Sequence, residues 1–382
     1  MRVSLLVVLL VSVTAFGLVE SGVIYQLFER LGYTVLCKNL FSEVTSNYSE
    51  VRGLSPSHYV NLHIVNLRWV EEHWGGGGDN PQLQVEEDIY KALLMMPDDF
   101  SLRDIENQKT LSIIAAASSG EIYVVEEYFN PSDRVQGSKT LAHELTHIIQ
   151  GDHFPHHHTS WYDASQAWSA LIEGDASVTA DMYAQYLSLT TGTAVHGASI
   201  PPSLIDLWLF PYQYGHSFVS HLHSVGGWNL VNNAYYRTPN TTEQILHPEK
   251  YLQNEGFQIV SSPTPLPPYV ILRTDRLGEY FISVFLSSHI DPQESGIAST
   301  GWNGDNFTYY KVGEDSIFAW SIAWDTERDQ QEFHEAIEIM MKNLEATPLE
   351  YNRWKIGWRY ITLKEEDDGI THLTVSSNLE SS

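Results

Sequence analysis

One stretch of the chain decides the expected fold and site: Ser138-Lys139-Thr140-Leu141-Ala142-His143-Glu144-Leu145-Thr146-His147-Ile148-Ile149-Gln150-Gly151. Ser138 is a typical N-cap and Gly151 a typical C-terminal stop, so the stretch predicts a helix with both ends marked. Apolar side chains recur within it at helical spacing and predict its buried face. They are Leu141, Leu145, Ile148 and Ile149.

Two histidines leave this helix from one face. His143 and His147 are four residues apart, which is about 40° around the axis and about 6 Å along it. That spacing lets two imidazole nitrogens meet one zinc ion at about 2.0–2.1 Å each. Glu144 lies about 100° away, where its carboxylate can reach a water on the metal without being a ligand. The pattern His-Glu-x-x-His is the zincin signature.

A hydrolytic zinc site needs a third protein ligand and an open fourth position for water. Two candidates compete for this place. His153 stands ten residues after His143, as the third histidine of metzincins does, but Gln150 occupies the place where that motif has a turning glycine. Glu173 stands on a second predicted helix over residues 165–187. We favour Glu173 as the ligand and keep His153 as the alternative.

The two motifs together resemble a known clan. His143-Glu144-Leu145-Thr146-His147 followed by Glu173-Gly174-Asp175-Ala176 is similar to the gluzincins, the thermolysin-like zinc metallopeptidases. The pairing is most similar to that of a group of secreted archaeal and bacterial proteins. The resemblance extends from Asp88 to the C-terminus. It implies a zinc ion held by the two histidines and Glu173, with Glu144 as general base.

The chain departs from the clan at one position. Thermolysin-like enzymes carry an aspartate four residues after the glutamate ligand, and this aspartate orients a ligand histidine. Here Ser177 stands at that position. Asp175 and Asp181 are the remaining candidates for orienting a histidine.

The expected fold class is α+β with two domains. A mostly helical, zincin-like catalytic domain with a small N-terminal sheet is expected over residues 21–260. A smaller α+β domain is expected over residues 269–382, after the proline-rich stretch 261–268. In this second domain the pattern predicts a helix over 277–287, a strand over 317–324, a helix capped by Thr326 and Asp329, and one strand through Trp354 and Tyr360 that reaches a hairpin turn at Asp368-Gly369.

A further strand is predicted over residues 120–126, followed by a turn at 130–132 and then the zinc helix. In zincins a strand in this place forms the edge of the sheet over the cleft. An extended peptide can pair with such an edge through backbone hydrogen bonds. An ordinary sheet strand is the alternative interpretation.

The N-terminus predicts export. Met1-Arg2 precede a run without charge from Val3 to Val19. A basic start and a long apolar run are typical of a signal peptide or an N-terminal membrane anchor, which we assign to residues 1–20. The expected location is extracellular or at the cell surface, with the N-terminal segment as a membrane tether if it stays attached.

Composition narrows the chemistry. The net charge of −27, from 21 basic and 48 acidic residues, argues against a nucleic-acid partner, because that binding depends on Lys and Arg at phosphates. The single cysteine, Cys37, excludes an intramolecular disulfide and an all-cysteine metal site. Histidines and carboxylates must therefore hold any metal.

The sequence thus predicts a zinc metallopeptidase that acts on a peptide or protein. Its oxyanion needs a second donor besides zinc. Tyr214 is our candidate for this donor, with His216, His221 and His223 as alternatives. Two other functions stay open: a zinc hydrolase of a non-peptide bond, and a non-catalytic extracellular module that binds glycans or a partner through Trp302, Trp320 and Trp324.

Overall fold

The computed structural model describes residues 23–75, 80–186, 200–263, 269–312, 315–366 and 368–378. The chain is an α+β protein, as predicted. Its described residues divide into two compact units: unit 1 contains residues 23–70, 113–152 and 179–186, and unit 2 contains those of residues 71–112, 153–178 and 200–378 that the structure describes. The predicted signal or anchor segment, residues 1–20, lies outside the described residues.

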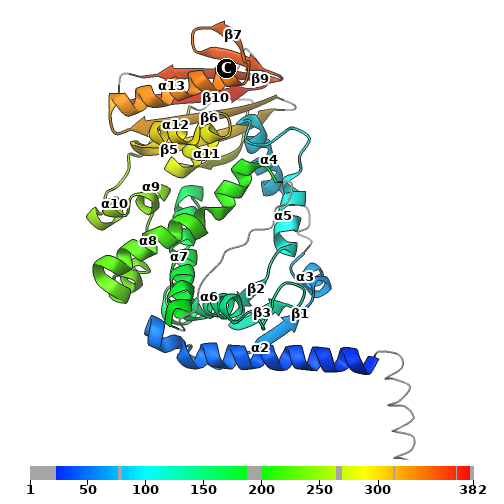
Figure 1. The fold of residues 1–382 in the computed structure, drawn as a ribbon. Helices are drawn as coiled ribbons and strands as arrows, with labels where there is room; N and C mark the ends of the chain where they lie inside the picture. The colour runs from blue at the N-terminus through cyan, green and yellow to red at the C-terminus, as the bar shows by residue number, and fades with distance from the viewer. Residues whose placement is uncertain are drawn as a thin grey trace, which may run out of the picture. The chain divides into compact units, whose positions relative to one another are not determined.

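Unit 1 contains a small sheet in the order β1-β3-β2 (Figure 1). The central strand β3 pairs in parallel with β1 and antiparallel with β2. The prediction that the strand before the zinc helix forms a sheet edge is therefore wrong, because β2 takes that edge. The described elements of this part of the chain are α2 (Val23–Arg52), β1 (Leu62–Val65), α3 (Leu67–His73), β2 (Ala115–Ser118), β3 (Glu121–Val125) and α6 (Arg134–His153).

The core of unit 1 forms where α2, the sheet and α6 meet. The predicted apolar stripe of α6 is buried there, together with Cys37 and Ile122. Helix α7 (Tyr162–Tyr186) contributes Ala180 and Tyr183 to the same core. A hydrogen bond of 2.7 Å joins the hydroxyls of Tyr48 in α2 and Thr146 in α6. Burial of these apolar side chains, at about 25 cal/mol per Å² of apolar surface, fixes α6 on α2.

Unit 2 contains a seven-stranded antiparallel sheet in the order β4-β5-β6-β10-β9-β8-β7. Three helices of this unit, α11, α12 and α13, pack together against it (Figure 1). The elements of unit 2 besides α7 are α4 (Pro81–Ala92), α5 (Leu102–Leu111), α8 (Pro202–Ala234), α9 (Thr242–Leu246), α10 (Pro248–Gln253), β4 (Val270–Asp275), α11 (Gly278–Ser287), α12 (Pro292–Ser299), β5 (Trp302–Val312), β6 (Asp315–Trp324), α13 (Glu327–Asn343), β7 (Thr347–Glu350), β8 (Arg353–Ile356), β9 (Arg359–Glu365) and β10 (Ile370–Ser376).

The predicted elements of the second domain are largely confirmed. The helix expected over 277–287 is α11, and the strand expected over 317–324 is β6. Thr326 caps α13 by accepting a hydrogen bond from the Asp329 amide. The prediction of one strand from Trp354 to Tyr360 is wrong, because Gly357 adopts a φ of +56° and the chain turns there from β8 into β9.

A buried polar network joins three helices of unit 2. Asp163, in the first turn of α7, accepts hydrogen bonds from the Thr242 amide and hydroxyl at 2.7 Å each, and from Arg276 Nε at 3.0 Å. Asp305 accepts from the Leu277 and Gly278 amides at the start of α11. The charged side chains of Asp163, Arg276 and Asp305 are all buried. Their charges are tolerated because each has hydrogen-bond partners inside the unit.

Helices α7 and α8 touch through their backbones. A Cβ atom placed on Gly174 would lie 2.2 Å from the Gly215 carbonyl oxygen, and one on Gly215 would lie 2.2 Å from the Ala170 carbonyl oxygen. Side chains cannot fit at these two positions unless the helices separate. The glycine pair therefore sets the distance between α7 and α8 beside Glu173.

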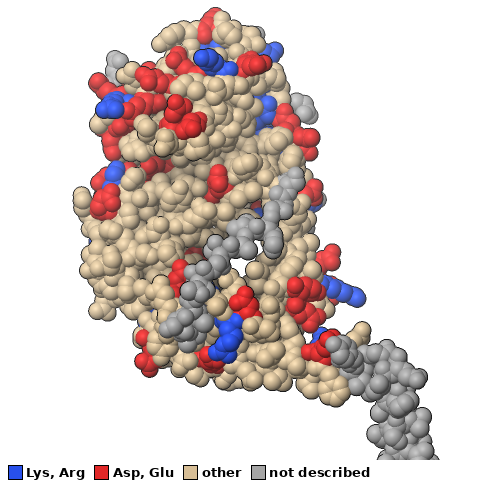
Figure 2. All heavy atoms as spheres, viewed as in Figure 1, with Lys and Arg blue, Asp and Glu red and all other residues tan. Residues whose placement is uncertain are grey.

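The face of the molecule drawn in Figure 2 is acidic. Figure 2 shows acidic side chains outnumbering basic ones on the face that is drawn. Among the described helices, none is both long enough and apolar enough to cross a membrane.

The glycine contact predicts opposite effects for two helical glycines. Gly174→Ala should lower the free energy of unfolding by about 2 kcal/mol or more, because the new methyl group collides with backbone. Gly151→Ala in α6 is the matched control: a Cβ there meets nothing within 4 Å, so we expect a gain of up to about 1 kcal/mol. Urea denaturation measures both, and equal effects would contradict the close contact.

Candidate metal centre

The helix that carries the His-Glu-x-x-His motif is longer than predicted at both ends. It runs from Arg134 to His153, so Ser138 is a buried residue inside it and Gly151 does not end it. Asp133 provides the cap instead, because its carboxylate accepts a hydrogen bond of 3.1 Å from the Gln136 amide. The motif therefore lies in the middle of α6, where the backbone is held on both sides.

The two histidines of the motif converge on one point. Their Nε2 atoms lie 3.2 Å apart, and their rings meet at 83°. In a tetrahedral zinc site with bonds of about 2.0–2.1 Å, two ligand nitrogens are about 3.3 Å apart. The observed separation of His143 and His147 fits that geometry.

Gln150 favours one tautomer of the neutral His147 ring. Its amide oxygen lies 2.8 Å from His147 Nδ1. Since this oxygen only accepts hydrogen bonds, Nδ1 carries the proton and the Nε2 lone pair of the neutral ring is left for a metal. A polar residue three positions after a ligand histidine lies on the same helical face, which is the signal that sequence reasoning overlooked.

Glu173 joins the two histidines. One ligand atom from each of His143, His147 and Glu173 lies within 4.8 Å of the others. The residue stands on α7, an unbroken helix whose later residues Ala180 and Tyr183 pack in the same core as α6. Two imidazole nitrogens and one carboxylate oxygen are the donor set of many catalytic zinc sites, so these residues fit the ion that the sequence implies.

His153 does not join this group. Because α6 continues to His153 without a turn, ten residues separate it from His143 along one helix. This separation corresponds to about 15 Å along the axis and about 80° around it. One ion cannot reach both side chains across that distance. The metzincin-like arrangement requires a turn that this helix does not make.

Glu144 is buried within α6, with 8% of its surface exposed. It follows His143 directly, and its carboxylate leaves the helix about 100° from the imidazole. The neighbouring turn is held by Thr146, whose hydroxyl donates to the Ala142 carbonyl at 2.8 Å. These contacts hold the backbone that carries Glu144 without using its carboxylate.

Tyr214 lies in α8 within an aromatic cluster. Its ring centroid is 5.4 Å from that of Phe210 and 5.1 Å from that of Tyr280. Burial, with a smaller contribution from Asp206, raises the pKa of Tyr214, so the phenol stays protonated and able to donate at neutral pH. Tyr214 and His216 flank Gly215, which touches the α7 backbone next to Glu173. His223, another candidate on α8, packs its ring against Trp228.

The two aspartates considered as orienting groups make other strong contacts. Asp175 is buried and accepts a hydrogen bond of 2.7 Å from the Tyr235 hydroxyl. Asp181 forms an ion pair of 2.6 Å with Lys139. Gln150 contacts Nδ1 of His147 directly and is our candidate for the orienting residue.

Comparison with known proteins adds one match. Residues 269–376 match a family model described as a domain of unknown function, DUF8575. This segment contains the sheet strands β4 to β10 and helices α11 to α13, and it lies outside the three candidate ligands. No curated protein and no solved structure matches the chain.

The Gln150 contact predicts a loss of zinc affinity without a loss of ligands. Gln150→Met keeps the volume but removes the acceptor for His147 Nδ1–H, so the zinc dissociation constant should rise by about 10–100-fold. Gln150→Glu keeps an acceptor and should stay within a few-fold of wild type. Competition with a chromophoric chelator measures both constants. Unchanged affinity in Gln150→Met would contradict the orienting role.

Proposed function

We propose that this protein is an exported zinc-dependent metallopeptidase. The observation that carries the proposal is the convergence of ligand atoms from His143, His147 and Glu173, with Glu144 next to the first ligand. A bare His-Glu-x-x-His pattern occurs on many helices that bind nothing. The third ligand, brought from a separate helix, is what favours a metal site over such a chance match.

The residues of the site have distinct roles in this proposal. When bound, zinc polarises the scissile carbonyl and acidifies a water molecule beside it. Glu144 takes the proton from that water and later transfers it to the leaving amine, first as general base and then as general acid. His147 is held in the metal-binding tautomer by Gln150. Tyr214 or His216 supplies the second donor to the oxyanion.

The proposed substrate is a peptide or an unfolded protein segment. An extended chain can add to a sheet through backbone hydrogen bonds only where a strand edge is free. In the small sheet the edges are β1 and β2, because β3 lies between them. The proposal therefore assigns peptide pairing to β1 or β2 in place of the strand over 120–126.

Export is part of the proposal on sequence grounds. The apolar run from Val3 to Val19 after Arg2 is typical of a signal or an N-terminal anchor. Such a protein acts outside the cell or at its surface. The excess of acidic residues argues against nucleic acid as a partner.

The rival binding-module hypothesis loses its main support. Its candidate contact residues, Trp302, Trp320 and Trp324, are buried in unit 2. The indole nitrogens of Trp302 and Trp320 each donate to Asp305 at 2.9 Å. These tryptophans are part of the buried core and are not exposed to a glycan or partner.

The proposed general base predicts a separation of activity from metal binding. Glu144→Gln should bind about one zinc per chain but lose at least about 100-fold of peptidase activity, because an amide cannot accept the proton. Glu50→Gln, at an exposed position of α2, is the control and should retain full activity. Cleavage of an unfolded protein and a quenched peptide library measures activity. Equal activity in Glu144→Gln and wild type, or no zinc in either, would overturn the proposal.

The proposed third ligand predicts different results for two alanine variants. Glu173→Ala should lose zinc at micromolar free metal, because only two protein ligands remain. His153→Ala should keep it, because His153 lies outside the ligand group. Metal analysis after gel filtration reads out both. Loss of zinc in His153→Ala with retention in Glu173→Ala would instead support a metzincin-like site.

A further inference from the structure

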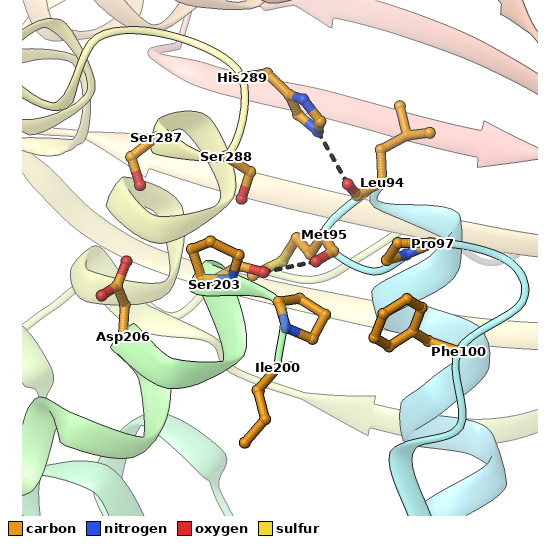
Figure 3. Close-up of a pocket in the computed structure, with 12 residues that line it drawn as sticks. Leu94, Met95, Pro97, Phe100, Ile200, Ser203, Asp206, Ser287, Ser288 and His289 are labelled. Carbon is orange, nitrogen blue, oxygen red and sulfur yellow. Dashed lines mark hydrogen bonds between the residues drawn. The ribbon is translucent and has the colours of Figure 1, made fainter. Parts of the chain in front are cut away.

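Unit 2 contains a cavity of about 520 Å³ that the proposed metal centre does not use. This volume lies within the range of sites that hold small organic ligands. Figure 3 shows its two sides: Asp206 of α8 and the serines that end α11 lie on one, and Pro97 and Phe100 of the loop after α4 lie on the other. The remaining lining residues are mostly apolar: Leu94, Met95, Ile200, Pro201 and Pro202, together with Ser203 and His289.

The serine hydroxyl groups that line the cavity already donate hydrogen bonds to backbone carbonyls. Ser287 and Ser288 donate to the Val284 carbonyl at 3.2 and 2.8 Å. Ser203 donates to the Met95 carbonyl at 2.6 Å, as Figure 3 shows. Their oxygens therefore offer a ligand only lone pairs.

The histidine of the wall offers no further charge. His289 Nε2 lies 2.9 Å from the Leu94 carbonyl, which only accepts, so this nitrogen carries the proton. Burial lowers the pKa of His289, which keeps the ring neutral at neutral pH. Three prolines in the wall, Pro97, Pro201 and Pro202, have no N–H to donate.

The carboxylate of Asp206 faces this cavity without a cationic neighbour. Neither Lys nor Arg is among the residues that line it. Partial burial raises the pKa of Asp206, and no positive group of the described chain offsets that rise. The C-terminal end of α11, at Ser287, and the N-terminal end of α8, at Pro202, both border the cavity, and their opposite partial charges offset each other. The side chains that line the cavity thus present hydrogen-bond acceptors and one carboxylate beside apolar surface, and the cavity opens to solvent at the exposed residue Asp206.

We propose that this cavity binds an organic cation: a protonated amine or guanidinium group that carries an apolar body. The cation pairs with Asp206 and donates to the oxygens of Ser287 and Ser288, and the apolar body packs against Phe100, Pro97 and the side chain of Ile200. Such a ligand matches both the acceptor side chains and the apolar surface of the cavity. A neutral alcohol of the same shape matches the apolar surface alone.

Two matched probes test this assignment on the full chain. Isothermal titration would compare 4-phenylbutylamine with 4-phenylbutan-1-ol, in the presence of a chelator so that no metal holds the amine. Wild type should bind the amine at least tenfold more tightly than the alcohol. Asp206→Asn should weaken amine binding at least tenfold and leave alcohol binding within twofold.

Controls separate the site from nonspecific binding and from misfolding. Glu294→Gln, at an exposed position of α12, removes one negative charge elsewhere in unit 2 and should leave amine binding unchanged. If Asp206→Asn melts far below wild type, Asp206→Ser replaces it with the same expected loss. The proposal is overturned if the amine does not bind at millimolar concentration, if the alcohol binds as tightly, or if the folded Asp206 variant binds the amine like wild type.

Discussion

A buried ion pair between Asp163 and Arg276 fixes the first turn of α7, and much of unit 2 is built around it. Asp163 also holds the start of α9 through Thr242, while the segment that contains Arg276 leads directly into α11. Gly278 completes this arrangement, because a Cβ there would lie 1.9 Å from the Asp163 carboxylate. Removing one partner of a buried ion pair typically costs about 3–5 kcal/mol. The pair therefore holds the starts of α7, α9 and α11 together.

The helix that carries Glu173 depends on this anchor. Glu173 lies ten residues after Asp163 on the same unbroken helix. Directly after Glu173, Gly174 lets α8 approach to backbone contact. The position of Glu173 within unit 2 is thus determined by packing that begins ten residues away. A carboxylate ligand on a rigid helix keeps its geometry better than one on a loop.

The sequence predicted best those helices in which apolar residues recur at helical spacing. Helices α6 and α7 could be predicted from helical spacing, and α13 also from its cap at Thr326, because both signals act locally. The caps expected for α6 at Ser138 and Gly151 were wrong, because the helix continues beyond both residues. Strand order could not, since β3 is central only because β2, a short run of Ala and Ser, pairs on its outer side. The turn at Gly357 was hidden by the alternating aromatics around it. The cavity beside Asp206 joins residues from three distant segments, and no local signal marks it.

Gln150 connects the two hypotheses about the third ligand. A glycine at this position lets the metzincin chain turn, so that a third histidine returns to the metal. Glutamine instead continues the helix, which carries His153 away from His143. The same side chain accepts a hydrogen bond from His147 Nδ1–H, which leaves the Nε2 lone pair for a metal. The residue that weakens the metzincin-like arrangement in sequence therefore strengthens the two-histidine, one-glutamate arrangement in structure.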